Sequence, residues 1–422
     1  MIDELRWRGL LADATEHAQT ALTDGKVTGY IGFDPTASSL HVGSLVPIMG
    51  LVHLQRAGHC PIALVGGGTG LIGDPSGKSS ERALLDRAQA EANAEGIHRQ
   101  LAAFLDFESR TAPARMANNL DWLGDLGLVD FLRDTGKHFA VNAMLRKESV
   151  RRRIADEDSG ISFTEFSYQL LQAYDFLELN RRYGCTLQMG GSDQWGNITA
   201  GIDLVRRMGG PRCHGVVFPL VESSRGVKFG KTEEGTVWLD PERTSPYRFY
   251  QFWLNTEDGD VIRYLKMFTL LDRPTIDELA QAVADRPHAR ETQRRLASEM
   301  TRTVHGAEGL DRAERASRVL FGGSVEGGLG AADIAAIRAD VPSHAVARTE
   351  LVGKAELPGL MAKAELTVSR NEGRRLIRGG GVYLNGERVL DERAVVRDSD
   401  LIEDRFALVR IGKKRYLVVE AV

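Results

Sequence analysis

Short apolar runs that end in glycine alternate with longer stretches of helical spacing over the first 220 residues. Runs at 29–33, 61–66 and 187–191 have the length of buried strands, and residues 45–54 keep the spacing of a helix. Alternating strands and helices of this kind are typical of βαβ units, which place parallel strands side by side. The pattern therefore predicts an α/β domain built on a parallel sheet.

The pattern changes after Ser245 and Pro246. From there to about residue 320 the chain is rich in Ala, Glu, Arg and Leu at helical spacing, and Pro246 stands where a helix can begin. Five glycines within residues 322–330 disfavour a regular element and predict a linker. Beyond it, short alternating strands surround Asn385-Gly386, a hairpin signal. We predict a parallel-sheet domain at 1–240, a helical domain at 241–321, a glycine-rich linker region at 322–350 and a small α/β module at 351–422.

Composition excludes several classes of protein. With 42% hydrophobic and 27% charged residues the chain has enough apolar surface to fold. No stretch approaches about 18 uninterrupted apolar residues, so we expect no membrane partner. Three cysteines match no zinc or redox spacing, which is typical of reduced thiols and predicts a cytoplasmic protein. The net charge is −4, but residues 351–422 carry 14 basic and 11 acidic residues, which permits an RNA-facing module.

A glycine-rich segment at 66–79 follows an apolar strand and allows two interpretations. Gly68, Gly70 and Gly73 fit the dinucleotide fingerprint, whereas Gly77-Lys78-Ser79 ends like a P-loop. The P-loop interpretation is weak, because Ile72 occupies the position of its first glycine. A glycine turn with a purely structural role is the alternative to both.

Two further segments carry residues suited to polyphosphate. His41 follows a strand and a turn at the start of a helix, where it can donate to a phosphate, and Gly43 lets a flat ring approach the backbone. Lys228 and Lys231 lie three residues apart in a loop and can reach one polyphosphate together. A surface histidine beside a helix cap and a solvated basic turn are the alternatives.

A predicted helix at 164–179 begins with a capping residue and carries polar groups on one face. Tyr168, Gln172 and Asp175 follow the spacing i, i+4 and i+7, and they offer directed hydrogen bonds. A solvated polar face is the alternative interpretation. A second face should bury against the sheet; it consists of Phe166, Leu170, Ala173 and Leu177.

These motifs occur together, in this order, in class I aminoacyl-tRNA synthetases, which the sequence resembles. His41-Val42-Gly43-Ser44 is similar to the HIGH motif and Lys228–Thr232 to the KMSKS loop of that class. The segments 29–36, 73–78, 168–175 and 190–197 resemble the bacterial tyrosyl-tRNA synthetases, and the likeness runs from about Leu5 to the C-terminus. Ser44 departs from the family, which has a second His or an Asn there, so no role is carried over to it.

The resemblance implies a Rossmann-like catalytic domain, a helical domain on the anticodon side and a small RNA-binding module shared with a ribosomal protein. It implies that ATP, accompanied by Mg²⁺, activates L-tyrosine to tyrosyl-adenylate and pyrophosphate, and that tyrosine is then transferred to tRNA(Tyr). No tightly bound cofactor and no resident metal are expected, and the family forms homodimers. A tryptophanyl relative and a non-catalytic RNA-binding paralogue are the alternatives.

By the same resemblance, individual residues receive roles. Tyr30 and Asp175 reach the substrate hydroxyl, and its ammonium group is held by Asp74, Tyr168 and Gln172. Catalytic contacts to the phosphates come from Thr36, His41, Lys78, Arg82, Lys228 and Lys231. The nucleotide and the adenylate are held by Gly32, Asp34, Gly43, Gly191, Asp193, Gln194 and Lys231. A basic surface for tRNA consists of Arg370, Arg374, Arg378, Lys413 and Lys414.

Overall fold

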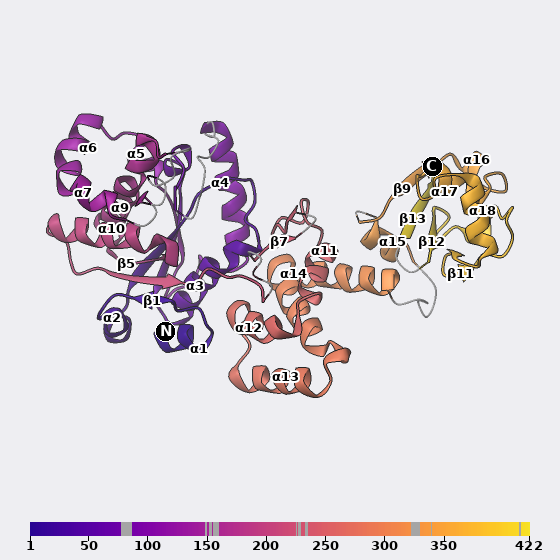
Figure 1. Cartoon of the computed structure of the whole chain (residues 1–422), viewed down its shortest axis with the longest axis horizontal. Coiled ribbons are helices and arrows are strands. Elements are labelled where there is room, and N and C mark those ends of the chain that lie inside the picture. Colours follow the sequence, from indigo (N-terminus) through magenta and orange to yellow (C-terminus); the bar gives the residue numbers. More distant parts are fainter. Residues whose placement is uncertain are drawn as a thin grey trace. The chain divides into compact units, whose positions relative to one another are not determined.

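The computed structural model describes residues 1–76, 87–147, 150–151, 154, 160–224, 226, 229–232, 235–321, 330–338, 340–412 and 415–422 (Figure 1). The chain divides into two compact units. The first comprises Met1–Asp240 and Glu257–Thr292, and the second comprises Pro241–Thr256 and Gln293–Val422. Each unit is described separately below.

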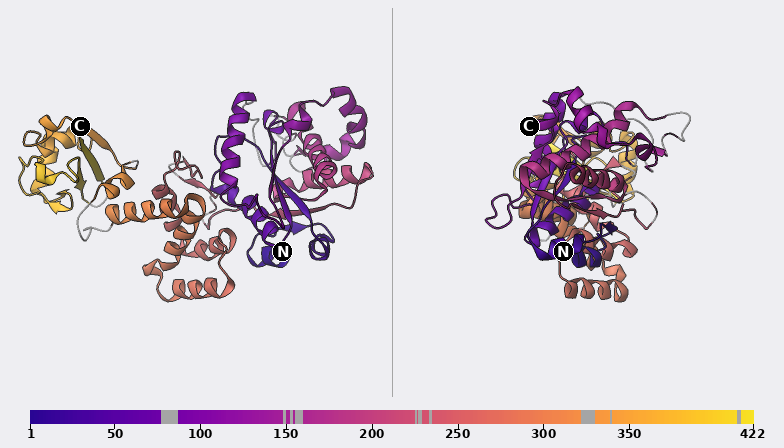
Figure 2. Two further views of the ribbon diagram at one scale, coloured as in Figure 1. Left: turned by 180° about the vertical axis from the view of Figure 1, so that it is seen from behind. Right: turned by 90° about the vertical axis from the view of Figure 1, so that its left-hand side faces the viewer.

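The first unit is built on a six-stranded sheet of order β1-β6-β5-β2-β3-β4, visible in Figures 1 and 2. Its parallel strands are β2 (Thr28–Phe33), β3 (Cys60–Val65), β4 (Arg115–Asn118), β5 (Cys185–Gly191) and β6 (His214–Phe218), and β1 (Asp13–Ala14) pairs antiparallel at the edge. The predicted α/β fold with a parallel sheet is confirmed. The order reverses between β2 and β5, and such a switch point leaves a crevice at the carboxyl ends of the strands.

Helices cover both faces of this sheet. Helix α3 (Leu45–Arg56) packs on one face, where a Cβ on Gly50 would lie 2.2 Å from the ring of Phe218, so only glycine fits. The other face, which includes Tyr30, is covered by α9 (Phe163–Tyr183) and α10 (Trp195–Arg207). Smaller elements complete this part: α1 (Ile2–Trp7), α2 (Ala18–Asp24), α4 (Arg87–Leu101), α5 (Leu120–Leu123), α6 (Leu128–Asp134), α7 (Val141–Leu145) and the 3₁₀ turns Val42–Ser44, Thr69–Leu71, Gly136–His138 and Ser192–Gln194.

The predicted helix around Tyr168 exists but differs in two details. It starts at Phe163, and its cap is Ser162, whose hydroxyl accepts from the N–H of Glu165. Ala173 and Leu177 pack on the sheet as expected. Phe166 and Leu170 do not; they join a separate cluster with Phe131 of α6 and Met144 of α7, because these short helices cover the first turns of α9.

Helices α12 (Asp258–Phe268) and α13 (Arg273–Asp285), with a 3₁₀ turn at Pro287–Ala289, belong to the first unit, whereas the predicted division assigns them to the helical domain. The side chain of Arg8 explains part of this difference. Its guanidinium donates to the carbonyl oxygens of Lys266, Thr269 and Leu271 at 3.0, 2.7 and 2.9 Å. Lys266 lies in the last turn of α12, where carbonyl oxygens lack intrahelical partners, and Thr269 and Leu271 follow the end of the helix.

The second unit begins with α11 (Pro246–Leu254), and the predicted helix start is confirmed, since Pro246 occupies the first turn and the Ser245 hydroxyl accepts from the N–H of Arg248. Most of α14 (Glu291–Phe321) belongs here, with a kink at Gly306 (φ 74°). The glycine-rich residues 322–329 lie outside the described residues. The linker is shorter than the predicted 322–350, because α15 (Ala331–Ile337) and β9 (Ser343–Val346) are part of the C-terminal module.

That module contains a five-stranded sheet of order β11-β10-β12-β13-β9. The other strands are β10 (Val382–Leu384), β11 (Glu387–Arg388), β12 (Phe406–Ile411) and β13 (Arg415–Ala421), and the helices are α16 (Arg348–Leu351), α17 (Leu357–Lys363), α18 (Arg370–Arg378) and a 3₁₀ turn at Asp398–Asp400. The predicted hairpin is confirmed: Asn385 and Gly386, both with positive φ, join β10 to β11.

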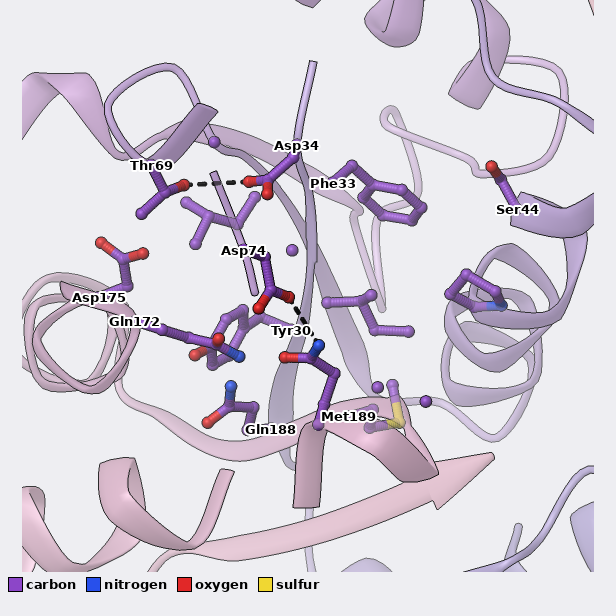
Figure 3. A pocket seen from close by; sticks show the side chains of 18 of the residues that line it. Tyr30, Phe33, Asp34, Ser44, Thr69, Asp74, Gln172, Asp175, Gln188 and Met189 are labelled. Carbon is purple, nitrogen blue, oxygen red and sulfur yellow. Dashed lines mark hydrogen bonds between the residues drawn. The ribbon is translucent and has the colours of Figure 1, made fainter. Parts of the chain in front are cut away.

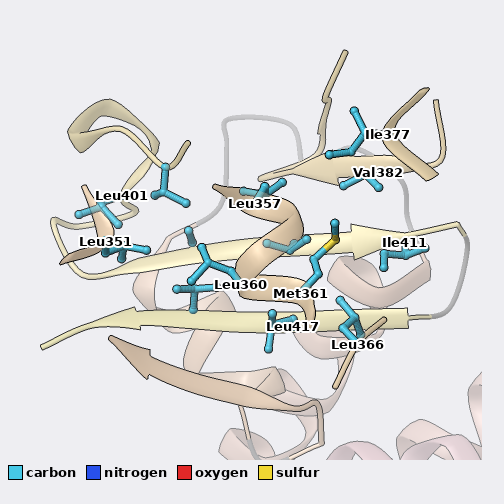
Figure 4. Close-up of a cluster of buried hydrophobic side chains, with 14 residues drawn as sticks. Leu351, Leu357, Leu360, Met361, Leu366, Ile377, Val382, Leu401, Ile411 and Leu417 are labelled. Carbon is cyan, nitrogen blue, oxygen red and sulfur yellow. The ribbon is translucent and has the colours of Figure 1, made fainter. Parts of the chain in front are cut away.

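Each face of the small sheet has its own apolar cluster. Figure 4 shows the first, in which Leu360 and Met361 of α17 pack over Leu417 and Ile411. On the second, Tyr416 and Val418 pack with α15 and with the end of α14, and the Tyr416 hydroxyl donates to the carbonyl oxygen of Leu320 at 2.7 Å. The module is therefore docked on α14 through an apolar contact as well as joined to it by the glycine-rich segment.

Candidate active site

A cavity of about 400 Å³ opens at the carboxyl ends of β2 and β5, where the strand order reverses (Figure 3). Tyr30 and Asp175 lie on one side of it and Ser44 lies on the opposite side. Of the residues predicted from the sequence, those that line the cavity are Tyr30, Gly32, Asp34, Thr36, Gly43, Asp74, Tyr168, Gln172, Asp175, Gly191, Asp193 and Gln194.

Tyr30 presents a buried polar atom to the cavity. The side chain comes from β2, is 1% exposed, and packs its ring 5.3 Å from that of Phe176. Within the described part of the chain its buried hydroxyl has no hydrogen-bond partner. Burial, assisted by the negative charge of Asp175, raises the pKa of this phenol well above its usual value. The hydroxyl therefore stays protonated and remains able to donate and to accept.

Asp175 of α9 is the polar group that lies beside Tyr30 in the cavity lining. One carboxylate oxygen accepts from Nδ2 of Asn119 at 2.9 Å, and the other accepts from Nε1 of Trp122 at 2.8 Å. Burial raises the pKa of this carboxyl to about 7, although the two N–H donors act in the opposite direction. Each oxygen keeps a lone pair for a further donor, so the carboxylate can accept from a bound hydroxyl.

A second polar group forms around Asp34 and Tyr168. The Tyr168 hydroxyl donates to one oxygen of Asp34 at 3.1 Å, and the Thr69 hydroxyl donates to the other, also at 3.1 Å. Asn119 in turn donates to the Thr69 hydroxyl at 2.9 Å. The network therefore connects the two halves of the site and fixes the orientation of both carboxylates.

Asp74 lies beside this group and is held on both oxygens. One accepts from Nε2 of Gln194 at 2.7 Å and the other from the N–H of Ser76 at 2.8 Å. Burial and the nearby charge of Asp34 raise the pKa of Asp74 to about 6. Oε1 of Gln172 accepts from Asn197 at 2.9 Å. Two carboxylates, a phenol and an amide thus share one wall, which suits a bound ammonium group.

The glycine-rich turn after β3 serves close packing. A Cβ on Gly66 would lie 2.3 Å from a carboxylate oxygen of Asp34, and one on Gly67 would lie 2.3 Å from Oδ1 of Asn118. Oδ1 of Asn119 accepts from the N–H of Gly68 at 2.7 Å. The glycines therefore let this backbone approach the polar network, which agrees with the structural alternative. Lys78 and Arg82 lie outside the described residues.

His41 lies at the rim rather than in the wall of the cavity. Its Nδ1 accepts from the N–H of Gly43 at 3.0 Å and so caps the turn that carries Gly43 and Ser44 into the cavity lining. The neighbouring Val42 donates its N–H to the carbonyl of Val237 at 3.0 Å. The prediction of His41 in a helix-start turn is confirmed, but the cavity wall here consists of Gly43 and Ser44.

The predicted lysine loop adjoins this rim. The N–H of Val237 donates to the carbonyl of Gly230 at 3.3 Å, and a Cβ on Gly230 would lie 2.6 Å from Val42. The backbone oxygen of Phe229 lies 3.6 Å from the Cβ position of Gly43. Lys228 is outside the described residues, and Lys231 is placed by its backbone alone, in β7 (Lys231–Thr232), which pairs with β8 (Gly235–Thr236).

Sequence reasoning missed four polar residues of the site: Thr69, Asn119, Trp122 and Gln188. Gln188 is 2% exposed, pairs in register with Tyr30, and has a buried Oε1 without a partner among the described residues. A signal for it was present, since a glutamine inside an apolar strand must be buried. Asn119 and Trp122 carried no such signal, because only the packing of the turn after β4 against α9 brings them to Asp175.

The arginines predicted to contact tRNA lie on α18, but two of the three have partners in the module. Arg374 bonds to Glu356 at 2.9 Å, and Arg378 bonds through two nitrogens to Glu392 at 2.7 and 2.9 Å. Their basic face is therefore partly neutralised, in contrast to the prediction from spacing. Lys413 and Lys414 lie outside the described residues.

Within the described ranges, there is no group of three or more His, Cys, Asp and Glu side chains that could hold a metal ion. No helix in the same ranges combines the length and the apolar character needed to cross a membrane.

The fold and this site define a class of enzyme. The family described as tRNA synthetases class I (W and Y) matches residues 22–322, and the Tyrosine--tRNA ligase SYY-like C-terminal domain matches residues 333–419. The Tyrosine--tRNA ligase of Roseiflexus castenholzii is 53% identical over 423 residues, covering 100% of this chain and 99% of the relative. That of Bacillus caldotenax is 50% identical over 422 residues, covering 99% of each.

A solved structure agrees with these matches. The C-terminally truncated mitochondrial tyrosyl-tRNA synthetase of Coccidioides posadasii superposes with a TM-score of 0.65 at 31% identity, covering 74% of this chain and 90% of that one. The chain belongs to the tyrosine--tRNA ligase family of class I synthetases.

Proposed function

We propose that this chain activates L-tyrosine with ATP and transfers it to tRNA(Tyr). The observation that carries the proposal is the buried hydroxyl of Tyr30, which has no partner among the described residues and lies beside the carboxylate of Asp175. A phenol in the cavity can donate to Asp175 and accept from Tyr30. Phenylalanine would leave the Tyr30 hydroxyl without a partner in a buried site and would offer no further donor to Asp175, which is unfavourable, and tyrosyl-tRNA synthetases are themselves the standard example of this rule.

The ammonium group of the substrate is assigned to the wall of the cavity that carries Asp74, Tyr168 and Gln172. Asp74 accepts it as a carboxylate, with the oxygens of Tyr168 and Gln172 as further acceptors. Their hydrogen bonds to Asp34 and Asn197 hold these two side chains in place. The α-carboxylate would then point toward the part of the cavity lined by Gly43 and Gly191.

The first step is attack of the tyrosine carboxylate on the α-phosphorus of ATP, with pyrophosphate as the leaving group. The reaction needs no enzyme nucleophile, so positioning and charge must supply the catalysis. Gly32, Asp34, Gly191, Asp193 and Gln194 are assigned to the adenylate. The leaving group is assigned to Thr36, His41, Lys78, Arg82, Lys228 and Lys231, with Mg²⁺ entering as part of the ATP substrate.

In the second step tyrosine passes to the terminal ribose of tRNA, and we assign RNA contacts to the C-terminal module. Arg370, Arg374, Arg378, Lys413 and Lys414 are the proposed contacts. The ion pairs of Arg374 and Arg378 are solvent-exposed. Because solvent screens exposed ion pairs and leaves them weak, an RNA phosphate can replace their carboxylate partners. The three cysteines form no disulfide, which fits a cytoplasmic enzyme.

We assign homodimer formation to an apolar surface of the first unit. It carries several exposed large apolar side chains on α6, α7 and the first residue of α9: Leu128, Val129, Leu132, Val141, Leu145 and Phe163. Phe163 is 78% exposed, and a group of exposed apolar side chains of this kind marks a protein–protein contact surface. Phe163→Asp should shift the protein from dimer to monomer in analytical ultracentrifugation, and an unchanged dimer would remove this surface from the proposal.

Amino-acid-dependent pyrophosphate exchange, measured with each of the twenty amino acids, tests the proposed function. Exchange with tyrosine alone supports it. Exchange with tryptophan would favour an indole substrate. Binding of ATP and tyrosine without any exchange would identify a non-catalytic RNA-binding relative, and the departure at Ser44 makes that outcome informative.

A further inference from the structure

Helix α12 contacts the chain at two places near the lysine loop: at Glu222 and Ser224, before the loop, and at Phe229, within it. On the near side, a carboxylate oxygen of Asp260 accepts from the N–H of Ser224 at 2.8 Å. Arg263 donates to the carbonyl of Glu222 at 2.5 Å and to the other oxygen of Asp260 at 2.7 Å. Asp260 is 3% exposed, so its carboxylate is shielded from water, whereas the Arg263 side chain reaches the surface.

On the far side, α12 holds Phe229 through two aromatic rings. The ring of Phe229 is stacked on that of Phe268, with centroids 5.0 Å apart and an angle of 11°, and it lies tilted against Tyr264 at 4.9 Å. Tyr264 and Phe268 are 4% and 1% exposed. They follow Asp260 at spacings of four residues, so all three side chains share one face of the helix.

The helix that carries these contacts is itself anchored. The guanidinium of Arg8, 5% exposed, bonds to three carbonyl oxygens at its end and to Glu4 of α1 at 2.6 Å. Apolar residues on its other faces, Val261 and Leu265, are fully buried. A helix fixed in this way can hold another segment in a defined position.

The segment that it holds reaches the cavity. Phe229 and Gly230 lie against Val42 and Gly43, and Gly43 lines the cavity. Lys228 and Lys231, which the proposed function assigns to the leaving pyrophosphate, flank this pair in the sequence. We propose that α12 is a positioning platform for Phe229 and Gly230. Through their contacts with Phe229, Tyr264 and Phe268 set the distance of the loop backbone from the part of the cavity that the proposed function assigns to the nucleotide.

This inference rests on the proposed function, and it specifies which step the platform serves. Charge on the leaving pyrophosphate develops in the transition state, so groups that meet it there must be placed in advance. The proposed function assigns tyrosine binding to Tyr30, Asp175 and Asp74, and the hydrogen bonds of these two carboxylates go to residues outside α12. Disturbing the platform should therefore slow adenylate formation and leave tyrosine binding unchanged.

The test replaces Phe268 by leucine, which keeps an apolar side chain and removes the stacked ring. The kcat for tyrosine-dependent pyrophosphate exchange should fall roughly three- to tenfold, the range that one aromatic pair supports, while the KM for tyrosine stays constant. Tyr264→Phe, which keeps its ring, should retain the rate. Leu265→Val serves as the matched control, because it removes one buried methylene group from the same helix and keeps both rings that pack against Phe229.

A double variant with Lys231→Ala separates positioning from general damage. If the platform acts through the loop, Phe268→Leu should change the rate little once Lys231 is absent, whereas unrelated damage would multiply the two effects. Equal losses in Leu265→Val and Phe268→Leu, or a rise in the tyrosine KM, would overturn the platform. A normal rate in Lys231→Ala with a slow Phe268→Leu would retain the platform and remove that lysine from the proposed function.

Discussion

Replacing Tyr30 by phenylalanine should make the ligand-free protein more stable and the enzyme less selective. The hydroxyl is buried and has no partner among the described residues, so it loses its hydration on folding and regains nothing from the protein. Leaving one such group unsatisfied costs about 1–3 kcal/mol. Removing one oxygen at the edge of an existing cavity leaves little new empty space. The free energy of unfolding should therefore rise by about 1 kcal/mol or more.

The same change should weaken the recognition of tyrosine. A neutral hydrogen bond contributes about 0.5–1.5 kcal/mol, so kcat/KM for tyrosine should fall by roughly two- to tenfold. The value for phenylalanine should stay constant or rise, because its ring meets no unpaired oxygen at this position. Stability and selectivity are thus expected to move in opposite directions.

Urea unfolding without ligand and pyrophosphate exchange with tyrosine and phenylalanine measure the two effects. Tyr168→Phe is the matched control, since its hydroxyl donates to Asp34 at 3.1 Å. Hydrogen bonds to charged groups are worth about 1.5–3 kcal/mol, so this variant should be destabilised. Loss of stability in Tyr30→Phe, or an unchanged ratio of tyrosine to phenylalanine activity, would refute the reasoning.

Four further predictions concern other groups of the molecule. Burial raises the pKa of Asp175 to about 7 and that of Asp74 to about 6. Because both side chains accept hydrogen bonds as carboxylates, the affinity for tyrosine should rise between about pH 5.5 and pH 8, as calorimetric titrations can measure. The Asp175→Asn variant should lose the upper part of that rise. The same raised pKa values mean that the native state binds these protons more tightly than the unfolded state, so their contribution to stability should fall as pH increases from about 4 to 7, as urea titrations can measure. Lys231→Ala should slow single-turnover adenylate formation far more than it weakens tyrosine binding, and a defect in binding alone would contradict its assignment to pyrophosphate. Deleting residues 330–422 should spare pyrophosphate exchange and abolish the charging of tRNA, whereas full charging by the shortened protein would show that the module is not needed for RNA.

Much of the fold could be predicted because its signals are local. Glycine-ended apolar runs indicated the parallel strands, Pro246 marked the start of a helix, and Asn385-Gly386 marked a hairpin. Each depends on backbone preferences of a few neighbouring residues, which act the same way in any fold. The polar face of α9 belongs to the same group, since the helical period alone brings Tyr168, Gln172 and Asp175 together.

Contacts between distant segments depended on the tertiary structure. Asn119 and Trp122 lie more than fifty residues from Asp175 and carry no sequence pattern that pairs them with it. The attachment of α12 to Arg8 and to Phe229 likewise joins segments whose own spacing is ordinary. Amino-acid sequence by itself determined which elements form and which polar groups each presents. Packing of one element on another decided which groups lost water, which gained partners, and which, like the Tyr30 hydroxyl, have no partner among the described residues.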